Sequence, residues 1–427
     1  MFIDKKIKII NYLFALLPVS IIIGNLAINL NVIIILLVGF LIFKKEIFIM
    51  EDKKYQYLLY LFFFYLLSTT LVNNILYFDT NNLLKNNFFK SIFFFRFLFL
   101  FLILNKLIEK KQFNLNIFYI SCAFFSIFLA FDIIFQVIFG KDLIGNRITF
   151  RRPSGFFGDE HIAGGYLQKF LLFFIFLITL KYFKNKEKIY YLFLVCFIPV
   201  VLTGNRMPAL IYCASFVLFF LLEKKFKQIT LIFLLLSVIL FTLIKNPLYP
   251  KFDRQLKVFF QESKELIIVL PKLLDKDFLK KNTLNIEVSP YLVHFNSGIE
   301  VWKKNKIFGN GLRSFRIHCE YSKNQTCNSH PHNYFLEIMI DTGIIGLIII
   351  YSFFILSVFN YLKFYFNNTE KKFKLITAPF FLIILFEFFP IRSTGSFFTT
   401  NNAVVIFLIL AFFINFRNLN FHNSLKT

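Results

Sequence analysis

Charged residues are scarce in this chain, and most of them are of one sign. Only 17% of the 427 residues are charged and 57% are hydrophobic, whereas about a quarter of the residues are charged in a typical soluble domain. This scarcity excludes an ordinary soluble domain. It predicts an all-α polytopic membrane protein, for which the bilayer is the main solvent. Acidic residues number 24 against 48 basic ones, so the formal net charge is +24.

The position of the lysines decides what this positive charge means. They gather in alternate connections between apolar runs, while the other connections are mostly short and rich in asparagine. The positive-inside rule places the lysine-rich connections and both termini in the cytoplasm. We therefore expect membrane lipid, and no nucleic acid, as the partner of these charges. We expect no cleavable signal peptide, because the first apolar run lacks a small-residue cleavage site and further runs follow at once.

Apolar runs long enough to cross a hydrocarbon layer of ~30 Å predict about twelve transmembrane helices. We expect them near residues 7–23, 26–43, 55–72, 88–105, 117–139, 162–183, 188–203, 206–222, 227–244, 335–361, 373–390 and 399–416. They divide the chain into transmembrane helices 1–9 in residues 1–244, a large periplasmic loop in residues 245–333, and transmembrane helices 10–12 in residues 334–427. The loop is far longer than usual and not of low complexity, so we expect a folded, partly helical subdomain.

Cysteine is also scarce, and only two of the five cysteines lie in the large loop. Cys319 and Cys327 could pair in an oxidising periplasm and close a small ring. A metal site is the alternative, because His318 and His330 are close in sequence. Two cysteines without paired short spacing are a weak signal for zinc, so we favour the disulfide.

Arginines mark two helix starts on the predicted outer side. Arg206 follows a Thr-Gly-Asn turn at the start of a helix, where free N–H groups and a guanidinium would bind an anion. An arginine that reaches to the membrane interface is the alternative. Arg151 and Arg152 precede a glycine-rich turn, and planar guanidinium groups suit phosphate. A loop folded against its own Asp159 and Glu160 would explain them equally well.

The large loop shows one helical pattern. Four of its apolar residues recur at helical spacing: Leu292, Phe295, Ile299 and Trp302. They predict an amphipathic helix on the membrane or on the helix bundle, with His294 off the apolar stripe. The Phe308-Gly-Asn-Gly311 turn then ends it. Arg313 and Arg316 follow, three residues apart, and would share one face if this segment is helical. They could form a functional pair, or they could simply belong to a solvated face.

A short polar segment lies directly before the tenth predicted helix. Pro331 restricts His330 to extended conformations, and Asn333 is a good N-cap for the helix. His332 therefore lies at a helix N-terminus near the outer membrane boundary. A neutral imidazole poised near pH 7 is the usual general base. A capping histidine without chemistry is the alternative.

Charges within or beside the apolar runs also need partners. The tenth helix is longer than the ~20 residues that a bilayer needs, so its first turns, with Glu337, should stand clear of lipid. Arg96, Asp132 and Glu387 are costly in lipid and should face the bundle interior or a cavity. Arg96 and Asp132 could pair between neighbouring helices. Arg392 ends a helix on the outer side, and we expect it to be a further phosphate contact.

These pieces together resemble the O-antigen ligase and O-antigen polymerase superfamily. The residues that carry the resemblance are Ser154-Gly-Phe-Phe-Gly-Asp159, Thr203-Gly-Asn-Arg206, Trp302, Phe308-Gly-Asn-Gly311, Phe315, Pro331-His332-Asn333-Tyr334, Leu336-Glu337, Thr342-Gly343 and Gly346. The resemblance implies a GT-C-like glycosyltransferase in the bacterial inner membrane. Its donor would be a glycan on undecaprenyl pyrophosphate at the periplasmic face. Its acceptor would be lipid A-core for a ligase, or another glycan repeat unit for a polymerase.

The resemblance also implies roles for particular residues. Arg206 would hold the pyrophosphate, and His332 would activate the acceptor hydroxyl for an inverting displacement. The family often has a further arginine near the start of the loop helix, where this chain has His294 and Ser297. We therefore predict substrate contacts among the remaining polar residues: Arg151, Arg152, His294, Arg313, Arg316, His330, Asn333, Glu337 and Arg392. No metal or other cofactor is expected, because the outer side shows no Asp-x-Asp-type pair.

Two other classes of protein fit part of the pattern. A transporter of lipid-linked oligosaccharides would explain many spans and intramembrane charges, but it should show repeated halves, and the sequence has no evident internal repeat. A non-catalytic partner in a membrane assembly is the other class. Substitutions on its outer side would change complex formation and not glycan transfer.

Overall fold

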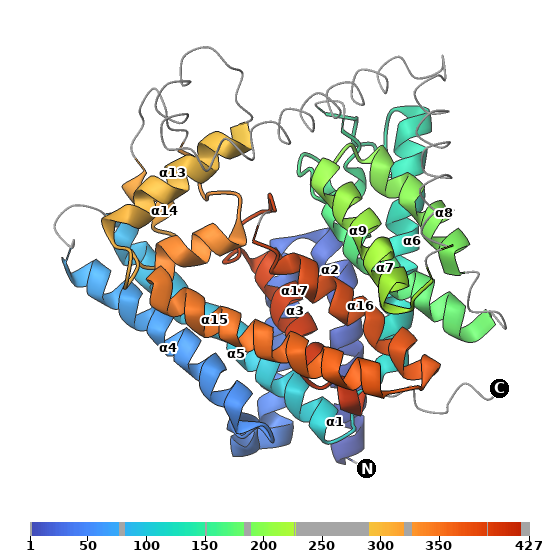
Figure 1. The fold of residues 1–427 in the computed structure, drawn as a ribbon, viewed down its shortest axis with the longest axis horizontal. Helices are drawn as coiled ribbons and strands as arrows, with labels where there is room; N and C mark the ends of the chain where they lie inside the picture. The colour runs from blue at the N-terminus through green and yellow to red at the C-terminus, as the bar shows by residue number, and fades with distance from the viewer. Residues whose placement is uncertain are drawn as a thin grey trace.

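The structure, a computed structural model, describes residues 2–76, 82–149, 152–182, 189–225, 227, 290–319, 327–390 and 392–419. The helices are α1 (Phe2–Ala15), α2 (Leu17–Ile23), α3 (Asn25–Phe43), α4 (Lys53–Leu76), α5 (Asn82–Glu109), α6 (Leu115–Phe139), α7 (Ala163–Tyr182), α8 (Ile189–Leu202), α9 (Arg206–Leu222), α13 (Pro290–Lys304), α14 (Phe315–His318), α15 (Tyr334–Asn367), α16 (Lys371–Glu387) and α17 (Thr400–Ile414). Short 3-10 turns are η1 (Lys44–Phe48), η2 (Gly155–Phe157) and η5 (Phe416–Asn418). The all-α polytopic class is confirmed (Figure 1).

The expected membrane spans coincide with helices wherever the structure describes them. Within the described residues, six helices are long and apolar enough to cross a membrane, or seven if α1 and α2, which are bent by 42°, form one span. The apolar helices α8, α9 and α17 are shorter. The span expected at 227–244 lies almost wholly outside the described residues, as does most of the large loop. The total of about twelve spans therefore stays a prediction.

Phenylalanine fills much of the interior, and α17 lies at its centre. Residues 403–413 of α17 are all buried. The ring of Phe407 packs against Phe63 of α4 and Phe94 of α5, with centroids 5.2 and 5.9 Å apart. Other positions face outward with apolar side chains, such as Leu26, which is 75% exposed. An apolar exterior is what lipid requires, and the packed α17 fixes its own N-terminus among the surrounding helices.

The two ends of the bundle differ in character. Helices α13 and α14 and the starts of α9, α15 and α17 lie at one end, which we call the loop end (Figure 1). The start of α1 and η5 lie at the opposite end. Lysine-rich turns lie there too, where Lys110 pairs with Glu46 of η1. This separation agrees with the alternation of lysine in the sequence.

Helix α15 corrects one expectation, because it is not a continuous helix. Its backbone breaks at Gly343, with φ 64° and ψ −170°, and its direction changes there (Figure 1). The turn after α13 fits into the break. Gly311 N donates to Asp341 O at 2.9 Å, and Ile344 N donates to Lys306 O at 3.0 Å. Backbone groups freed by the break are thus satisfied by another segment.

Glycine is required on both sides of this contact, which we call the glycine lock (Gly309 and Gly343). Both residues have positive φ, 84° and 64°. A Cβ atom on Gly343 would lie 2.1 Å from the carbonyl oxygen of Ile307, and one on Gly309 would lie 2.4 Å from Gly343 N. No side chain fits in that space. The glycines that carry the sequence resemblance therefore join the turn after α13 to α15 here.

The expected pair between Arg96 and Asp132 does not form. Arg96 donates to Phe93 O at 2.9 Å and to Thr400 Oγ1 at 3.0 Å. Asp132 accepts from Leu143 N at 3.0 Å. Each charge finds partners on the segments packed beside it, and Arg96 thereby ties α5 to the start of α17.

Candidate functional site

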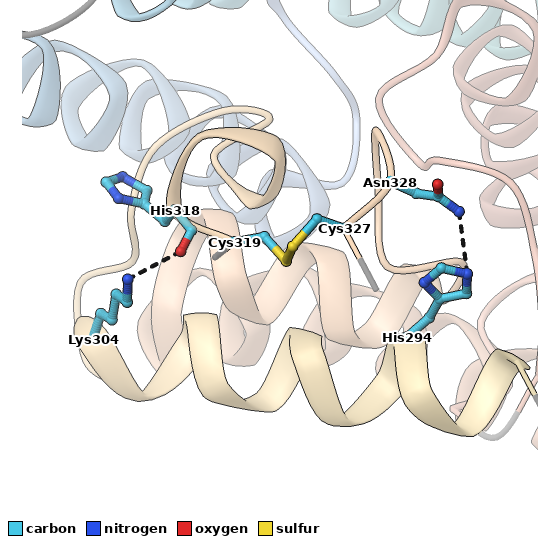
Figure 2. Close-up of a disulfide and its surroundings, with 6 residues drawn as sticks. All are labelled: His294, Lys304, His318, Cys319, Cys327 and Asn328. Carbon is cyan, nitrogen blue, oxygen red and sulfur yellow. Dashed lines mark hydrogen bonds between the residues drawn. A yellow bond between two sulfur atoms is a disulfide. The ribbon is translucent and has the colours of Figure 1, made fainter. Parts of the chain in front are cut away.

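Three histidines meet at the loop end although they come from distant parts of the chain. His294 lies on α13, and His330 and His332 lie just before α15. The ring centroids of His294 and His332 are 5.1 Å apart, and those of His330 and His332 are 4.2 Å apart. Asn328 Nδ2 lies 3.1 Å from His294 Nε2, as Figure 2 shows, and 3.4 Å from His332 Nε2. We call these four residues the histidine cluster.

The backbone of His332 is held in an uncommon conformation. Its φ is 56°, in the left-handed region that few residues other than glycine adopt. Its carbonyl oxygen accepts from Thr394 N at 2.8 Å. Next to it, the Asn333 side chain caps α15 by accepting from Leu336 N at 2.8 Å and donates to Arg392 O at 2.9 Å. The turn of residues 392–394 therefore fixes the direction of the His332 side chain.

Burial keeps two of the histidines neutral. It lowers the pKa of His330 to about 4, with further contributions from His332, His294 and Arg313. Burial also lowers the pKa of His332 below its ordinary value of 6.5, as does His294, while a hydrogen bond of the ring to the backbone of Thr394 opposes the shift. His332 is thus unprotonated near pH 7. A neutral imidazole can accept a proton, as a general base must.

Glu337, a predicted substrate contact, has partners inside the protein. Its side chain is buried, and it accepts from Ser396 Oγ and from Phe397 N, both at 2.6 Å. Both carboxylate oxygens are thereby engaged by the segment that leads into α17. The structure therefore makes Glu337 an anchor for this segment, which lies beside the turn that holds His332.

Arg392 also has internal partners. Its guanidinium lies 3.1 Å from Glu387, whose carboxylate also lies 3.1 Å from Lys169 of α7. All three residues are buried. The predicted phosphate contact of Arg392 is not supported, because the side chain is occupied in holding residues 386–392 together. Charged residues this deep are normally compensated by each other, as they are here.

Arg313 and Arg316 do not share a helical face as expected. Arg313 precedes α14 with a positive φ of 55°. Its N–H donates to Asp341 Oδ2 at 2.6 Å, and its guanidinium donates to Phe398 O at 2.9 Å. Arg316 lies in α14 and donates to Asn87 Oδ1 on α5 at 2.7 Å. The two guanidiniums nevertheless interact electrostatically, and Arg313 does so with His330 as well.

A disulfide joins Cys319 and Cys327, whose Cα atoms are 5.7 Å apart. It links the residue after α14 to the residue before Asn328 (Figure 2). Lys304, at the end of α13, donates to His318 O at 3.0 Å on the same side. Because both sulfur atoms are bonded in the disulfide, neither cysteine is a thiolate ligand for the metal site considered as the alternative. The covalent link holds Asn328 next to the histidines.

Replacing Cys319 and Cys327 together with serine should loosen the histidine cluster. A ring this small is worth roughly 2–3 kcal/mol by loop entropy. We expect a lower melting temperature in detergent and a partial loss of the protein's activity. A Cys196→Ser variant, which alters a buried thiol away from the cluster, is the matched control. An unchanged melting temperature in the double variant would show that the ring adds nothing.

Arg206 lies in a second group of residues. It is the first residue of α9, directly after Asn205, whose amide donates to His161 O at 3.1 Å. Arg152 interacts electrostatically with the His161 ring. Arg152 and Arg206 therefore lie at one corner, which we call the arginine corner, while Arg151 lies outside the described residues. Helix α9 packs against α7, α8 and α16, whereas α13 packs against α15. The arginine corner beside α9 and the histidine cluster beside α13 therefore lie on opposite sides of the loop end (Figure 1).

Two residues of the site could not be recognised beforehand. Asn328 touches two histidines but is an ordinary polar residue in sequence, and only its place beside Cys327 hinted at a fixed position. Thr394 bonds His332 through its backbone, for which a sequence holds no signal.

Among the residues that the structure describes, no group of three or more His, Cys, Asp or Glu is arranged to hold a metal ion.

The helices and these two groups define a multi-pass membrane protein with a polar site at one end of the bundle. A family model described as O-antigen ligase matches residues 191–351. The match spans α9, α13, the histidine cluster and the glycine lock, and it confirms the resemblance seen in the sequence. It supports a glycosyltransferase-type enzyme of polysaccharide assembly, of the O-antigen ligase or polymerase kind. No curated protein matches the chain.

Proposed function

We propose that this protein transfers a glycan from undecaprenyl pyrophosphate to an acceptor hydroxyl at the periplasmic face of the bacterial inner membrane. The acceptor in this proposal is lipid A-core, as for an O-antigen ligase; joining of repeat units, as by a polymerase, is the alternative. The observation that carries the proposal is the neutral, conformationally fixed His332 at the loop end. The lysine-rich opposite end would then face the cytoplasm.

His332 acts as the general base in this proposal. Its Nε2 accepts the proton of the acceptor hydroxyl while the hydroxyl oxygen attacks the anomeric carbon of the donor sugar. The new C–O bond forms on one face as the bond to the diphosphate breaks on the other, which inverts the configuration. Asn328 lies 3.4 Å from this nitrogen, a long contact that an acceptor hydroxyl can replace.

Undecaprenyl pyrophosphate leaves with its negative charge, which must be stabilised. Arg206 and Arg152 supply guanidinium groups at the arginine corner, and the free N–H groups at the start of α9 add to them. Stabilisation of this kind needs no metal ion. His294 lies beside His332 on α13, so we assign it to orienting the base and not to binding phosphate.

A transporter is the second candidate, because α15 is broken as transporter helices often are. The break at Gly343 is filled by the backbone of the turn after α13. In a transporter such breaks line a substrate path. The filled break therefore favours the enzyme.

A deletion strain tests the proposal and separates its two forms. Long glycan chains accumulating on undecaprenyl pyrophosphate would indicate a ligase. Single repeat units on the lipid core would indicate a polymerase. An unchanged pattern of lipid-linked and surface glycan, with the deletion verified and no second copy present, would contradict both.

A further inference from the structure

Four cations gather beside the histidine cluster, on α5 and on the segment of α14. Arg313 and Arg316 come from the segment of α14, and Lys90 and Arg96 come from α5. Arg313 interacts electrostatically with each of the other three. Arg313 also interacts with His330, so this group adjoins the proposed base. We call these four residues the cation cluster.

Among the described residues, no carboxylate forms a salt bridge with a side chain of the cation cluster. None of its four side chains lies within 4.0 Å of an acidic group among the residues that the structure describes. Two described acids act on the cluster electrostatically: Glu337 on Arg313, and Asp341 on Arg313 and Arg316. Glu337 accepts from Ser396 and Phe397, and Asp341 accepts from the backbone N–H of Arg313 and from Ser314. Among the described residues, four positive charges thus face two acidic groups.

The cluster also has hydrogen-bonding capacity to spare. The Nε atoms of Arg96 and Arg316 are buried from solvent and have no hydrogen-bond partner in the part of the chain that the structure describes. Burial and the neighbouring Arg313 lower the pKa of Arg316, and Asp341 opposes this shift only in part. Like charges held together in a partly buried place raise the free energy of the protein. A bound anion would remove that cost, and phosphate fits guanidinium groups best.

We propose that the cation cluster binds a phosphate group carried by the acceptor lipid. The inference rests on the proposed function, because it is the transfer reaction that requires two substrates. The arginine corner at the start of α9 and the histidine cluster beside α13 lie on opposite sides of the loop end (Figure 1), so the donor diphosphate and the acceptor phosphate would occupy different sites. An acceptor held by its own phosphate at the cation cluster then brings its hydroxyl toward His332.

The direct test measures binding to the full-length protein in lipid nanodiscs. The probes are a monophosphorylated lipid A-type glycolipid, its dephosphorylated form, and undecaprenyl pyrophosphate. In the variant Lys90→Gln/Arg316→Gln we expect affinity for the phosphorylated glycolipid to fall about tenfold or more, as expected for lost charge-assisted hydrogen bonds. Affinity for the dephosphorylated form and for undecaprenyl pyrophosphate should stay unchanged.

Controls separate a local effect from a folding defect. Lys90 makes no described hydrogen bond or ion pair, so its replacement should not disturb the fold. Lys303→Gln removes an exposed cation of α13 that pairs with Glu300, and it should leave all three affinities unchanged. Arg316→Lys keeps the charge and should restore part of the affinity. A melting temperature equal to that of the wild type confirms that each variant is folded.

Two results would overturn the inference. One is equal affinity of wild type and variant for the phosphorylated glycolipid. The other is a loss of affinity for undecaprenyl pyrophosphate alone, which would make the cluster a donor site. These outcomes do not depend on turnover. If the wild-type protein transfers no glycan, the proposed function fails by itself.

Discussion

Replacing His332 with alanine is expected to abolish glycan transfer while the protein stays folded and inserted. The imidazole is the proposed general base, and such a group typically contributes about 10²–10⁴-fold to the rate. Its side chain is only half-buried and forms no part of the apolar core, so the melting temperature should change little. Transfer is measured as surface glycan in a complemented deletion strain, with membrane insertion checked by protein abundance.

A matched variant shows whether the chemistry belongs to this histidine. His318 lies on the same side of the protein, and the pKa of its ring is also lowered, first by burial. It is outside the histidine cluster, so His318→Ala should keep most of the activity. Full-length surface glycan in His332→Ala cells, at wild-type abundance of the protein, would remove His332 from the mechanism.

The pH dependence of transfer follows from the same histidine. Burial and His294 place the pKa of His332 below 6.5, so the base stays neutral at pH 6.5 and the rate should fall only at lower pH. His294→Gln removes the neighbouring group that lowers the pKa of His332. The pKa of His332 then rises, and the acid limb of the rate profile should move to higher pH. An acid limb that does not move would show that another group limits the rate.

The second large effect is expected from Gly343→Ala. The φ of 64° and ψ of −170° at Gly343 lie in a region that essentially only glycine adopts, and a residue with a Cβ atom there costs about 1–3 kcal/mol. The larger cost is the contact with Ile307 O, since a Cβ atom at 2.1 Å cannot be accommodated without moving the backbone. The turn after α13 would leave the break in α15, and the bonds that join them would be lost. We expect little folded protein in membranes and a strongly lowered melting temperature.

Gly165→Ala is the control for this substitution. Gly165 lies in α7 and does not have a positive φ, and a Cβ atom added to it would meet no atom within 4 Å. Alanine there should be neutral or slightly stabilising. If Gly343→Ala folds as well as Gly165→Ala, the glycine lock does not hold the loop end together.

Hydropathy predicted the helices well, because lipid demands long apolar segments whatever their tertiary contacts. The N-cap of α15 was predictable from the local sequence, because the Asn333 side chain accepts a hydrogen bond from a backbone N–H in the first turn of the helix that follows it. The break at Gly343 escaped prediction because it depends on a turn inserted from a distant segment. The burial of His294, off the apolar stripe of α13, depends in the same way on Asn328 and His332.

Charged residues in apolar runs were the least predictable part. Arg392 resembled a phosphate contact, but Glu387 and Lys169 compensate it inside the protein. Arg96 was expected to pair with Asp132 and lies instead in the cation cluster. Sequence shows that such charges need partners. Only the packing of helices decides which partner each one meets.

Reconstituted transfer tests the central claim most directly. Purified protein in proteoliposomes is given a glycan on undecaprenyl pyrophosphate and a lipid A-core acceptor, and glycosylated acceptor and released undecaprenyl pyrophosphate are measured together. We predict that the two appear in equal amounts with the wild-type protein and that neither appears with His332→Ala. Two results would contradict the proposed function. One is equal transfer by the wild-type protein and by His332→Ala. The other is a wild-type protein that transfers glycan neither to lipid A-core nor to a second lipid-linked glycan.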